Sequence, residues 1–315
     1  MGSPEASVVI PTTREVRVGF ALEALAAQTL DPDRFEVVVV RDGAWSSEAR
    51  PSEPGLSVRF VDTDSRSNIA VVRNRGWQAA RGRLIAFTDD DCRPDPGWLA
   101  SLLAATDGDG VVVQGRTEPD PDELHLFHGL ARSQEIVGLS AWHETCNMLY
   151  PRALLERLGG FDERFAALGE DADLGLRARR EGAEFRYTDD ALVYHAVNQR
   201  TPASAIREAL RRDTIPLLLS RHPQRREALW GGIFWQRSHA LLLLAVGGVL
   251  LARRHRLAAL AAIPYVRHHT KADSLRGGPH RVARHAAYLG IRALVDAAEV
   301  VTTTAAAVRE RTLVI

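Results

Sequence analysis

Short, continuous apolar runs alternate with helical segments through the first third of the chain. Runs rich in β-branched residues are typical of buried strands, and the segments between them carry apolar residues at helical spacing. Strands of this kind, separated by helices, predict an α/β fold with a mainly parallel sheet flanked by helices. The expected strands are residues 6–11, 34–43, 56–63, 83–91 and 110–117, and the expected helices are residues 16–30, 68–82 (capped by Gly82) and 95–106.

Polar residues follow three of these strands where each apolar run ends. Pro11 and Thr12 close the first run, Asp42 and Gly43 close the second, and three aspartates at 89–91 close the fourth. In sheets of this type, ligands bind beyond the carboxyl ends of the strands. We therefore expect the three strand ends to converge on one crevice.

The remainder of the chain changes character twice. Residues 145–200 mix strand-like runs with helical segments, and from about residue 201 the sequence is helical with arginine-rich faces. A domain boundary is expected between residues 200 and 225. We divide the chain into a domain at 1–200 and a helical region at 201–315.

Composition limits the partners and the compartment. The chain has 40 basic and 40 acidic side chains, so its formal net charge of zero does not favour nucleic acid as a partner. The two cysteines, Cys92 and Cys146, form no disulfide framework and no metal-type spacing. Residues 1–15 carry no charged-then-apolar signal pattern, and a cytoplasmic location is expected.

The acidic triplet at 89–91 allows two interpretations. Adjacent carboxylates repel one another, and each requires water, a donor or a cation. Asp89 and Asp91, one residue apart in a strand-to-turn segment, could both reach one Mg²⁺ or Mn²⁺ ion, since these ions prefer oxygen ligands. Alternatively, the loop is only solvated, with Asp95 capping the next helix.

A second acidic group opens a well-signalled helix. Gly169 precedes Glu170 and Asp171, arginines follow, and Gly182 stands at the expected end. Acids at the positive end of a helix dipole need no further explanation. A carboxylate at this position is also rigidly held, as a general base must be.

Isolated residues at other strand ends are equally ambiguous. Asp42 either forms an ordinary Asp-Gly turn or accepts hydrogen bonds from a nucleoside, and Arg14 after the first strand could meet phosphate. His195 follows a strand and is either packed or a ligand.

Taken in order, the motifs resemble those of family 2 glycosyltransferases. The resemblance covers about residues 6–200 and rests on "VVIPTTRE", "LAAQTL", "FEVVVVRDGA", "RNRGWQAARGRLIAFTDDDCRPDPGWL", "NMLYPRALLERLGGFDERF" and "GEDADLGLRARREG". It implies a GT-A fold, which is a Rossmann-like arrangement, for the first domain, with a helical C-terminal extension.

The resemblance also implies roles for individual residues. Asp89 and Asp91 would be the outer members of a D-x-D motif around Asp90. Asp91 would bind the metal ion at the donor diphosphate, and Asp89 would lie near the ribose or the metal. His195 would touch the metal or a phosphate. Asp171 would be the catalytic base, with Glu170 beside it. The other residues implied for the nucleotide-sugar site are Pro11, Thr12, Arg14, Asp42, Arg73 and Asn74.

The implied reaction is an inverting sugar transfer to an acceptor hydroxyl. The donor would be a UDP-, GDP- or dTDP-linked sugar, and the acceptor a saccharide, a lipid-linked molecule or a small molecule, with cell-envelope polysaccharide among the products. Two alternatives remain open. One is a sugar nucleotidyltransferase, although "IPTTREVRVGF" lacks the glycine- and lysine-rich loop of that class; the other is a non-enzymatic, membrane-associated scaffold.

The C-terminal region contains two apolar pieces at 238–252 and 257–266, separated by "RRHR". The first is shorter than the roughly 20 residues that a membrane span requires. Residues 238–266 could form a buried helical subdomain or a shallow hairpin at the cytoplasmic face of the membrane. Contact with anionic lipid is favoured by the basic flanks, which are Arg237, Arg253, Arg254, Arg256, Arg267 and Lys271.

Overall fold

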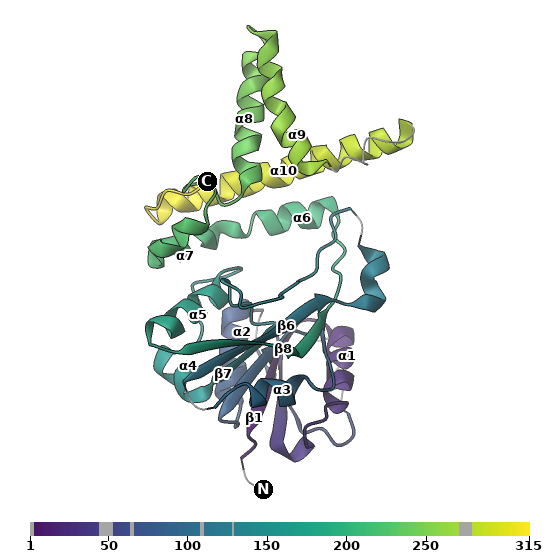
Figure 1. Cartoon of the computed structure of the whole chain (residues 1–315), viewed down its shortest axis with the longest axis vertical. Helices are drawn as coiled ribbons and strands as arrows, with labels where there is room; N and C mark the ends of the chain where they lie inside the picture. Colours follow the sequence, from purple (N-terminus) through teal and green to yellow (C-terminus); the bar gives the residue numbers. More distant parts are fainter. Residues whose placement is uncertain (1–2, 44–52, 64–65, 108–109, 128, 271–278) are drawn as a thin grey trace. The chain divides into compact units, whose positions relative to one another are not determined.

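Strands β1 to β8 pair into one sheet, in the order β3-β2-β1-β4-β7-β6-β8-β5 (Figure 1). The computed structural model describes residues 3–43, 53–63, 66–107, 110–127, 129–270 and 279–315. The strands are β1 (Ala6–Thr12), β2 (Phe35–Arg41), β3 (Val58–Asp62), β4 (Leu84–Thr88), β5 (Cys92–Pro94), β6 (Val111–Pro119), β7 (Asn147–Pro151) and β8 (Glu184–His195).

The sheet contains both parallel and antiparallel pairs, and the strands from the first part of the chain pair in parallel. β3, β2, β1 and β4 run parallel to one another, and β6 is parallel to β8. β7 is antiparallel to both β4 and β6, and β5 is antiparallel to β8. The mainly parallel α/β sheet predicted from the apolar runs is therefore confirmed, with an antiparallel insertion at β7.

Helices cover both faces of this sheet because its central strands are apolar on both sides. All seven residues of β1 and of β2 are buried. One face packs against α1 and α3, and the other packs against α2, α4 and α5. These helices are α1 (Glu15–Ala26), α2 (Ile69–Ala79), α3 (Trp98–Ala104), α4 (Arg152–Leu158) and α5 (Glu170–Arg180), with short 3₁₀ turns η1 (Pro32–Arg34) and η2 (Pro121–Leu126).

Two local predictions need correction. α2 ends at Ala79 with an extended residue after it, so Gly82 is not its C-cap. Gly82 instead lies against β1, where an added Cβ would come within 2.5 Å of the Ala6 backbone. The cap of α3 is Gly97, while the Asp95 carboxylate accepts a hydrogen bond from the Gly97 N–H in the preceding turn.

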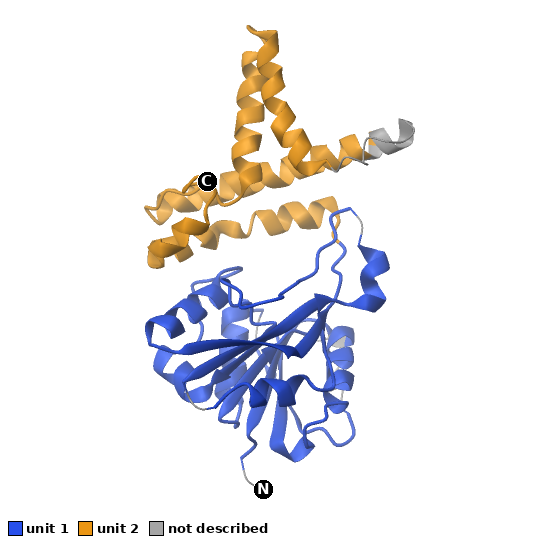
Figure 2. Cartoon of the chain, in the orientation of Figure 1, with its two compact units in different colours: residues 1–199 blue, residues 200–315 orange. Residues whose placement is uncertain are grey.

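The chain divides into two compact units, residues 1–199 and 200–315, which are coloured separately in Figure 2. The elements of the second unit are α6 (Pro202–Ala209), η3 (Arg212–Thr214), α7 (Ile215–Arg221), η4 (Pro223–Ala228), α8 (Arg237–Leu251), η5 (Arg256–Ala262), α9 (Ile263–His269) and α10 (Pro279–Arg309).

The two apolar pieces of the C-terminal region form a helical hairpin, with α8 beside η5 and α9 (Figure 1). Leu241, Leu242, Ala245 and Tyr265 are buried between its two arms. Within the described residues, no helix combines the length and apolar character that a membrane crossing requires. Of the predicted basic flanks, Lys271 lies outside the described residues.

Candidate active site

The carboxyl ends of β1 and β2 meet at one edge of the sheet, as the strand-end pattern predicted. Thr12 pairs with Arg41 in the parallel register, and the Asp42 N–H donates to the Thr12 carbonyl over 2.8 Å. β4 lies on the other side of β1, so its acidic loop emerges at this same edge. Pro11 is buried inside β1, opposite Val40.

Asp90 fastens the acidic loop to the end of β1. The Thr12 hydroxyl donates to its Oδ2 over 2.7 Å, and Arg14 Nε donates to the same oxygen over 3.2 Å. A second guanidinium nitrogen of Arg14 pairs with Asp90 Oδ1. The resemblance gave Asp90 the place of the variable middle residue, but it is 5% exposed and organises the loop.

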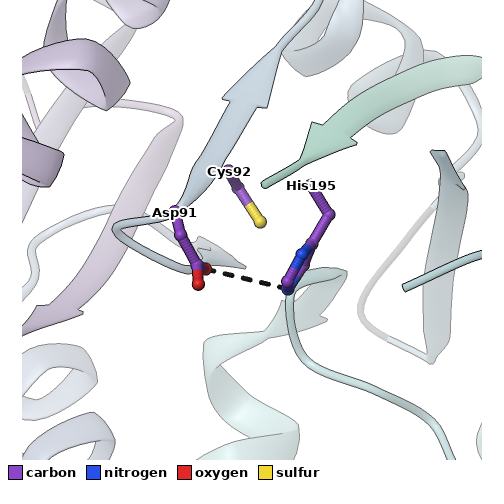
Figure 3. A group of neighbouring side chains, drawn as sticks. All are labelled: Asp91, Cys92 and His195. Atoms are coloured by element: carbon purple, nitrogen blue, oxygen red, sulfur yellow. Dashed lines mark ion pairs between the residues drawn. The ribbon is translucent and has the colours of Figure 1, made fainter. Parts of the chain in front are cut away.

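Asp91, Cys92 and His195 form a group whose donor atoms all lie within 4.8 Å of one another (Figure 3). Asp91 Oδ1 is 3.7 Å from His195 Nε2. His195 Nδ1 lies 2.9 Å from the Ala196 carbonyl, which can only accept, so Nδ1 carries the hydrogen. In the neutral ring, Nε2 therefore directs a lone pair toward Asp91.

The donors in this group fit a divalent cation. Burial raises the pKa of Asp91, but a protonated His195, Arg14 and the Asn198 hydrogen bond lower it by more, so the net shift is downward and favours the ionised form. The hydrogen bond with Cys146, together with burial, raises the pKa of the Cys92 thiol well above its usual value. The carboxylate suits Mn²⁺ or Mg²⁺, the softer imidazole suits Mn²⁺ better than Mg²⁺, and a neutral thiol contributes little to either ion.

Arg73 joins the acidic loop to the first turn of α5. Its side chain is 5% exposed, and it contacts Asp89 Oδ1 at 3.1 Å, Glu170 Oε1 at 2.8 Å and Asp171 Oδ1 at 2.8 Å. The resemblance implied that Asp89 lies near the ribose or the metal and that Arg73 belongs to the nucleotide site. The structure instead directs Asp89 toward Arg73 and buries Arg73 among carboxylates.

Asp171 is held from two sides. The Thr145 N–H donates to its Oδ2 over 3.0 Å, and the Thr145 hydroxyl donates to its Oδ1 over 2.6 Å. The first turn of α5 follows Gly169, whose φ of 96° favours glycine. The carboxylate therefore has a fixed orientation, and its side chain remains 20% exposed.

Glu170 is held in a different state. It is 6% exposed, and burial and the neighbouring Asp171 raise its pKa to about 8, against the lowering effect of Arg73. Its Oε2 has no hydrogen-bond partner among the described residues. A raised pKa of one carboxyl is the expected outcome when several acids share one buried arginine.

Asn74, a predicted nucleotide-site residue, is engaged in structural contacts. The Asn74 side-chain amide donates to the Phe161 carbonyl and to Glu163, and its oxygen accepts from Trp77 and from the Phe161 N–H. This amide holds the loop before α5 and has no remaining hydrogen-bonding capacity. Asn74 is thus not brought together with the strand-end residues.

Asp42 remains at the strand-end edge, where the sequence placed it. Its Oδ1 accepts from the Thr63 hydroxyl and from the Ser67 N–H, both over 2.9 Å, and the side chain is nearly buried. These bonds fix the carboxylate beyond the end of β2. Its second oxygen is the atom that a nucleoside could meet.

Sequence reasoning missed three residues of the site. Thr145 orients Asp171, Asn198 donates to Asp91 Oδ2 over 3.1 Å, and Cys92 joins the Asp91 group. Only Cys92 carried a signal, because it follows Asp91 directly. A cavity of about 250 Å³ opens beside Asp90 and Asp91 and is bordered by Arg17 and Arg93 among others.

Comparison with solved structures defines the class of fold. The mannosyltransferase PcManGT from Pyrobaculum calidifontis, in complex with GDP-Man and Mn²⁺, matches with a TM-score of 0.58 and 19% identity over 96% of this chain and 88% of that one. TarS 1-349 from S. aureus, in complex with UDP-GlcNAc, matches with a TM-score of 0.51 and 16% identity over 98% and 92%. The fold is of the GT-A type.

Sequence comparison identifies the family. The model for glycosyl transferase family 2 matches residues 7–169, just over half of the chain, and the protein belongs to this family. Validoxylamine A glucosyltransferase from Streptomyces hygroscopicus subsp. limoneus is 28% identical over 74% of this chain and 59% of its own length. Pre-mycofactocin glycosyltransferase from Mycobacterium tuberculosis is 31% identical over 62% of this chain and 44% of its own. This chain thus spans only part of these relatives.

Glu170→Gln is predicted to change the pH dependence of stability. With a folded-state pKa raised from 4.5 to about 8, Glu170 contributes stability that is fully present below about pH 4.5 and is lost as the pH rises to 8. The melting temperature of Glu170→Gln relative to the parent should therefore rise between pH 5 and pH 8. The exposed Glu181→Gln is the control, and its melting temperature should follow that of the parent at every pH. If the melting temperatures of Glu170→Gln and the parent also change in parallel with pH, the buried, protonated state of Glu170 is contradicted.

Proposed function

We propose that the protein is an inverting glycosyltransferase that moves a sugar from a nucleotide-diphosphate donor to an acceptor hydroxyl. The observation that carries the proposal is the Arg73 bridge. It connects the acidic loop after β4, on the donor side, with Asp171 at the start of α5. Two carboxylate groups with different tasks are thereby fixed relative to each other, as a displacement between two bound substrates requires.

On the donor side, Asp91 and His195 would hold Mg²⁺ or Mn²⁺. Such an ion supplies Lewis-acid stabilisation of the negative charge on a departing diphosphate. Arg14, which already contacts Asp91 Oδ2 at 3.2 Å, lies where its free hydrogens could reach phosphate oxygens. Asp42 would accept from the base or ribose of the nucleotide.

On the acceptor side, Asp171 would act as the general base. The Thr145 and Arg73 hydrogen bonds fix its direction, while one lone pair of Oδ2 remains available. As the acceptor oxygen forms its bond to the anomeric carbon, its proton passes to Asp171, and the bond from that carbon to the diphosphate breaks. A single displacement inverts the anomeric centre.

The named neighbours support the donor class. PcManGT is described with GDP-Man and Mn²⁺, and TarS with UDP-GlcNAc, so the proposed donor is a UDP-, GDP- or dTDP-linked sugar. The proposed acceptor is a saccharide, a lipid-linked molecule or a small molecule. Membership of family 2 also disfavours the nucleotidyltransferase alternative.

A screen of nucleotide sugars for metal-dependent thermal stabilisation tests the donor site. We expect one class of nucleotide sugar to raise the melting temperature in the presence of Mn²⁺ or Mg²⁺. In Asp91→Asn, the metal-dependent affinity for that donor, measured by calorimetry, should fall at least tenfold. Asp122→Asn, an exposed carboxylate near the same cavity, is the matched control. Equal metal-dependent affinity in Asp91→Asn and the parent would refute the metal role of Asp91.

Asp171→Asn is predicted to separate binding from turnover. The amide keeps the shape of the side chain but cannot take a proton, so donor affinity should stay within about threefold while turnover falls by at least 10²-fold, the usual scale for loss of a general base. Nucleotide release from the donor in the presence of acceptor measures turnover. Substantial transfer by Asp171→Asn would assign the base to another residue.

We further propose that the hairpin of α8, η5 and α9 contacts the cytoplasmic face of the membrane. Ten large apolar side chains lie exposed on it: Leu243, Leu244, Val246, Val249, Leu250, Leu251, Leu257, Leu260, Ile263 and Val266. At 100° per residue, those on α8 spread over roughly 220° of its circumference. A contact with a second copy would cover one face, whereas lipid can surround the hairpin.

Vesicle flotation tests this contact. Leu244→Gln combined with Leu251→Gln should abolish co-flotation with anionic vesicles. These side chains are 50% and 58% exposed, and both would enter the acyl region. Leu124→Gln combined with Val137→Gln removes comparable exposed apolar surface from the first unit and should leave flotation unchanged. A parent protein that stays with the soluble fraction would end the proposal.

A further inference from the structure

A cavity of about 500 Å³ lies at the base of the apolar hairpin. Its lining residues are Arg237, Ile263, Pro264, Arg267 and His268. Arg237 is the first residue of α8, and Arg267 and His268 belong to the last turn of α9. The cavity thus combines three basic side chains with the apolar start of α9.

The basic side chains of this cavity lack acidic partners in the part of the chain that the structure describes. Neither Arg237 nor Arg267 takes part in an ion pair there. The dipole of α9 favours cations in its last turn, which accounts for Arg267 and His268. Arg237 lies at the N-terminal, positive end of α8, where the helix dipole disfavours a cation.

The neighbouring acids do not neutralise the cavity, because each is already satisfied. Asp296 contacts Arg292 at 2.9 Å and His269 at 3.2 Å, and it is fully buried. Glu299 contacts His239 at 3.1 Å and Arg212 at 3.0 Å. The positive charge at the mouth of the cavity is therefore left for a ligand.

The N-terminus of α8 adds to the same field. Its N-cap residue, Gln236, makes no side-chain cap bond, because its amide donates to Glu299 over 3.2 Å. Open N–H groups at the start of a helix favour an anion. Burial, together with His269 and Arg237, lowers the pKa of His268 against the raising effect of Asp296.

We propose that this cavity binds the phosphodiester headgroup of an anionic phospholipid whose acyl chains lie along the apolar hairpin. The proposal rests on the membrane contact proposed above and specifies where the lipid phosphate is held. Arginine side chains bind phosphate oxygens through two parallel N–H groups. Ile263 and Pro264, both at the cavity wall, would meet the glycerol and the first acyl carbons.

A lipid phosphate fits better than free phosphate because charge and apolar surface are continuous here. Ile263 lines the cavity and is 48% exposed, and it continues into the exposed leucines of the hairpin. The other basic group, Arg253, Arg254 and Arg256, lies at the far end of α8, about 20 Å away at 1.5 Å per residue. It can reach headgroups if the hairpin lies along the interface.

Binding of dihexanoylphosphatidylglycerol below its micelle concentration, measured by calorimetry on the full chain, tests the proposal. Arg237→Gln combined with Arg267→Gln should lower the affinity at least tenfold. Arg253→Gln combined with Arg254→Gln removes the same charge from the hairpin tip and should change the affinity less than twofold. Both pairs are exposed, and circular dichroism verifies that each variant folds.

The outcomes separate the site from the membrane contact. Equal losses in both double variants, or no binding by the parent, would overturn the cavity as a headgroup site. Inorganic phosphate or sn-glycerol 1-phosphate binding as tightly as the lipid would also overturn it in favour of a free anion. Failure of the parent to float with vesicles, with the short-chain lipid still bound, would instead reject the membrane contact alone.

Discussion

The site depends on one buried guanidinium, that of Arg73, shared by carboxylates from two distant segments. Burying an unpaired charge is costly, and so is bringing ionised carboxylates together without a cation. The Arg73 ion pairs offset both free-energy costs, because the guanidinium reduces the repulsion between the carboxylates and the carboxylates compensate its buried charge. Without it, the loop after β4 and the first turn of α5 would repel each other.

The number of charges around Arg73 also has a consequence. One positive charge cannot compensate three ionised acids in a low-dielectric site, and the protein resolves the excess by keeping the Glu170 proton. Asp171 accepts two hydrogen bonds from Thr145 in addition to its contact with Arg73. Adjacent acids in one helix turn thus have different surroundings, which is how a neighbouring pair acquires separate roles.

The sequence predicted those parts of the structure that rest on local pattern. The apolar strands, the helix that follows Gly169 and the strand-end positions of Asp42 and Asp91 all follow from periodicity and turn chemistry. The Arg73 bridge joins residues 97 positions apart, and no local pattern encodes such a partner. Gly82 was misassigned for the same reason, because its constraint is the distant β1 backbone.

The second unit reverses the usual distribution of polar and apolar groups. Asp296, Glu299 and Thr303 of α10 are buried, whereas leucines and valines of α8 lie exposed. Asp296 accepts from the Tyr265 hydroxyl over 3.0 Å, so polar contacts fix the base of the hairpin to α10. In water, exposed apolar surface of this extent would be a liability. With its base held by buried ion pairs and its arms apolar, the hairpin suits surroundings that are themselves apolar.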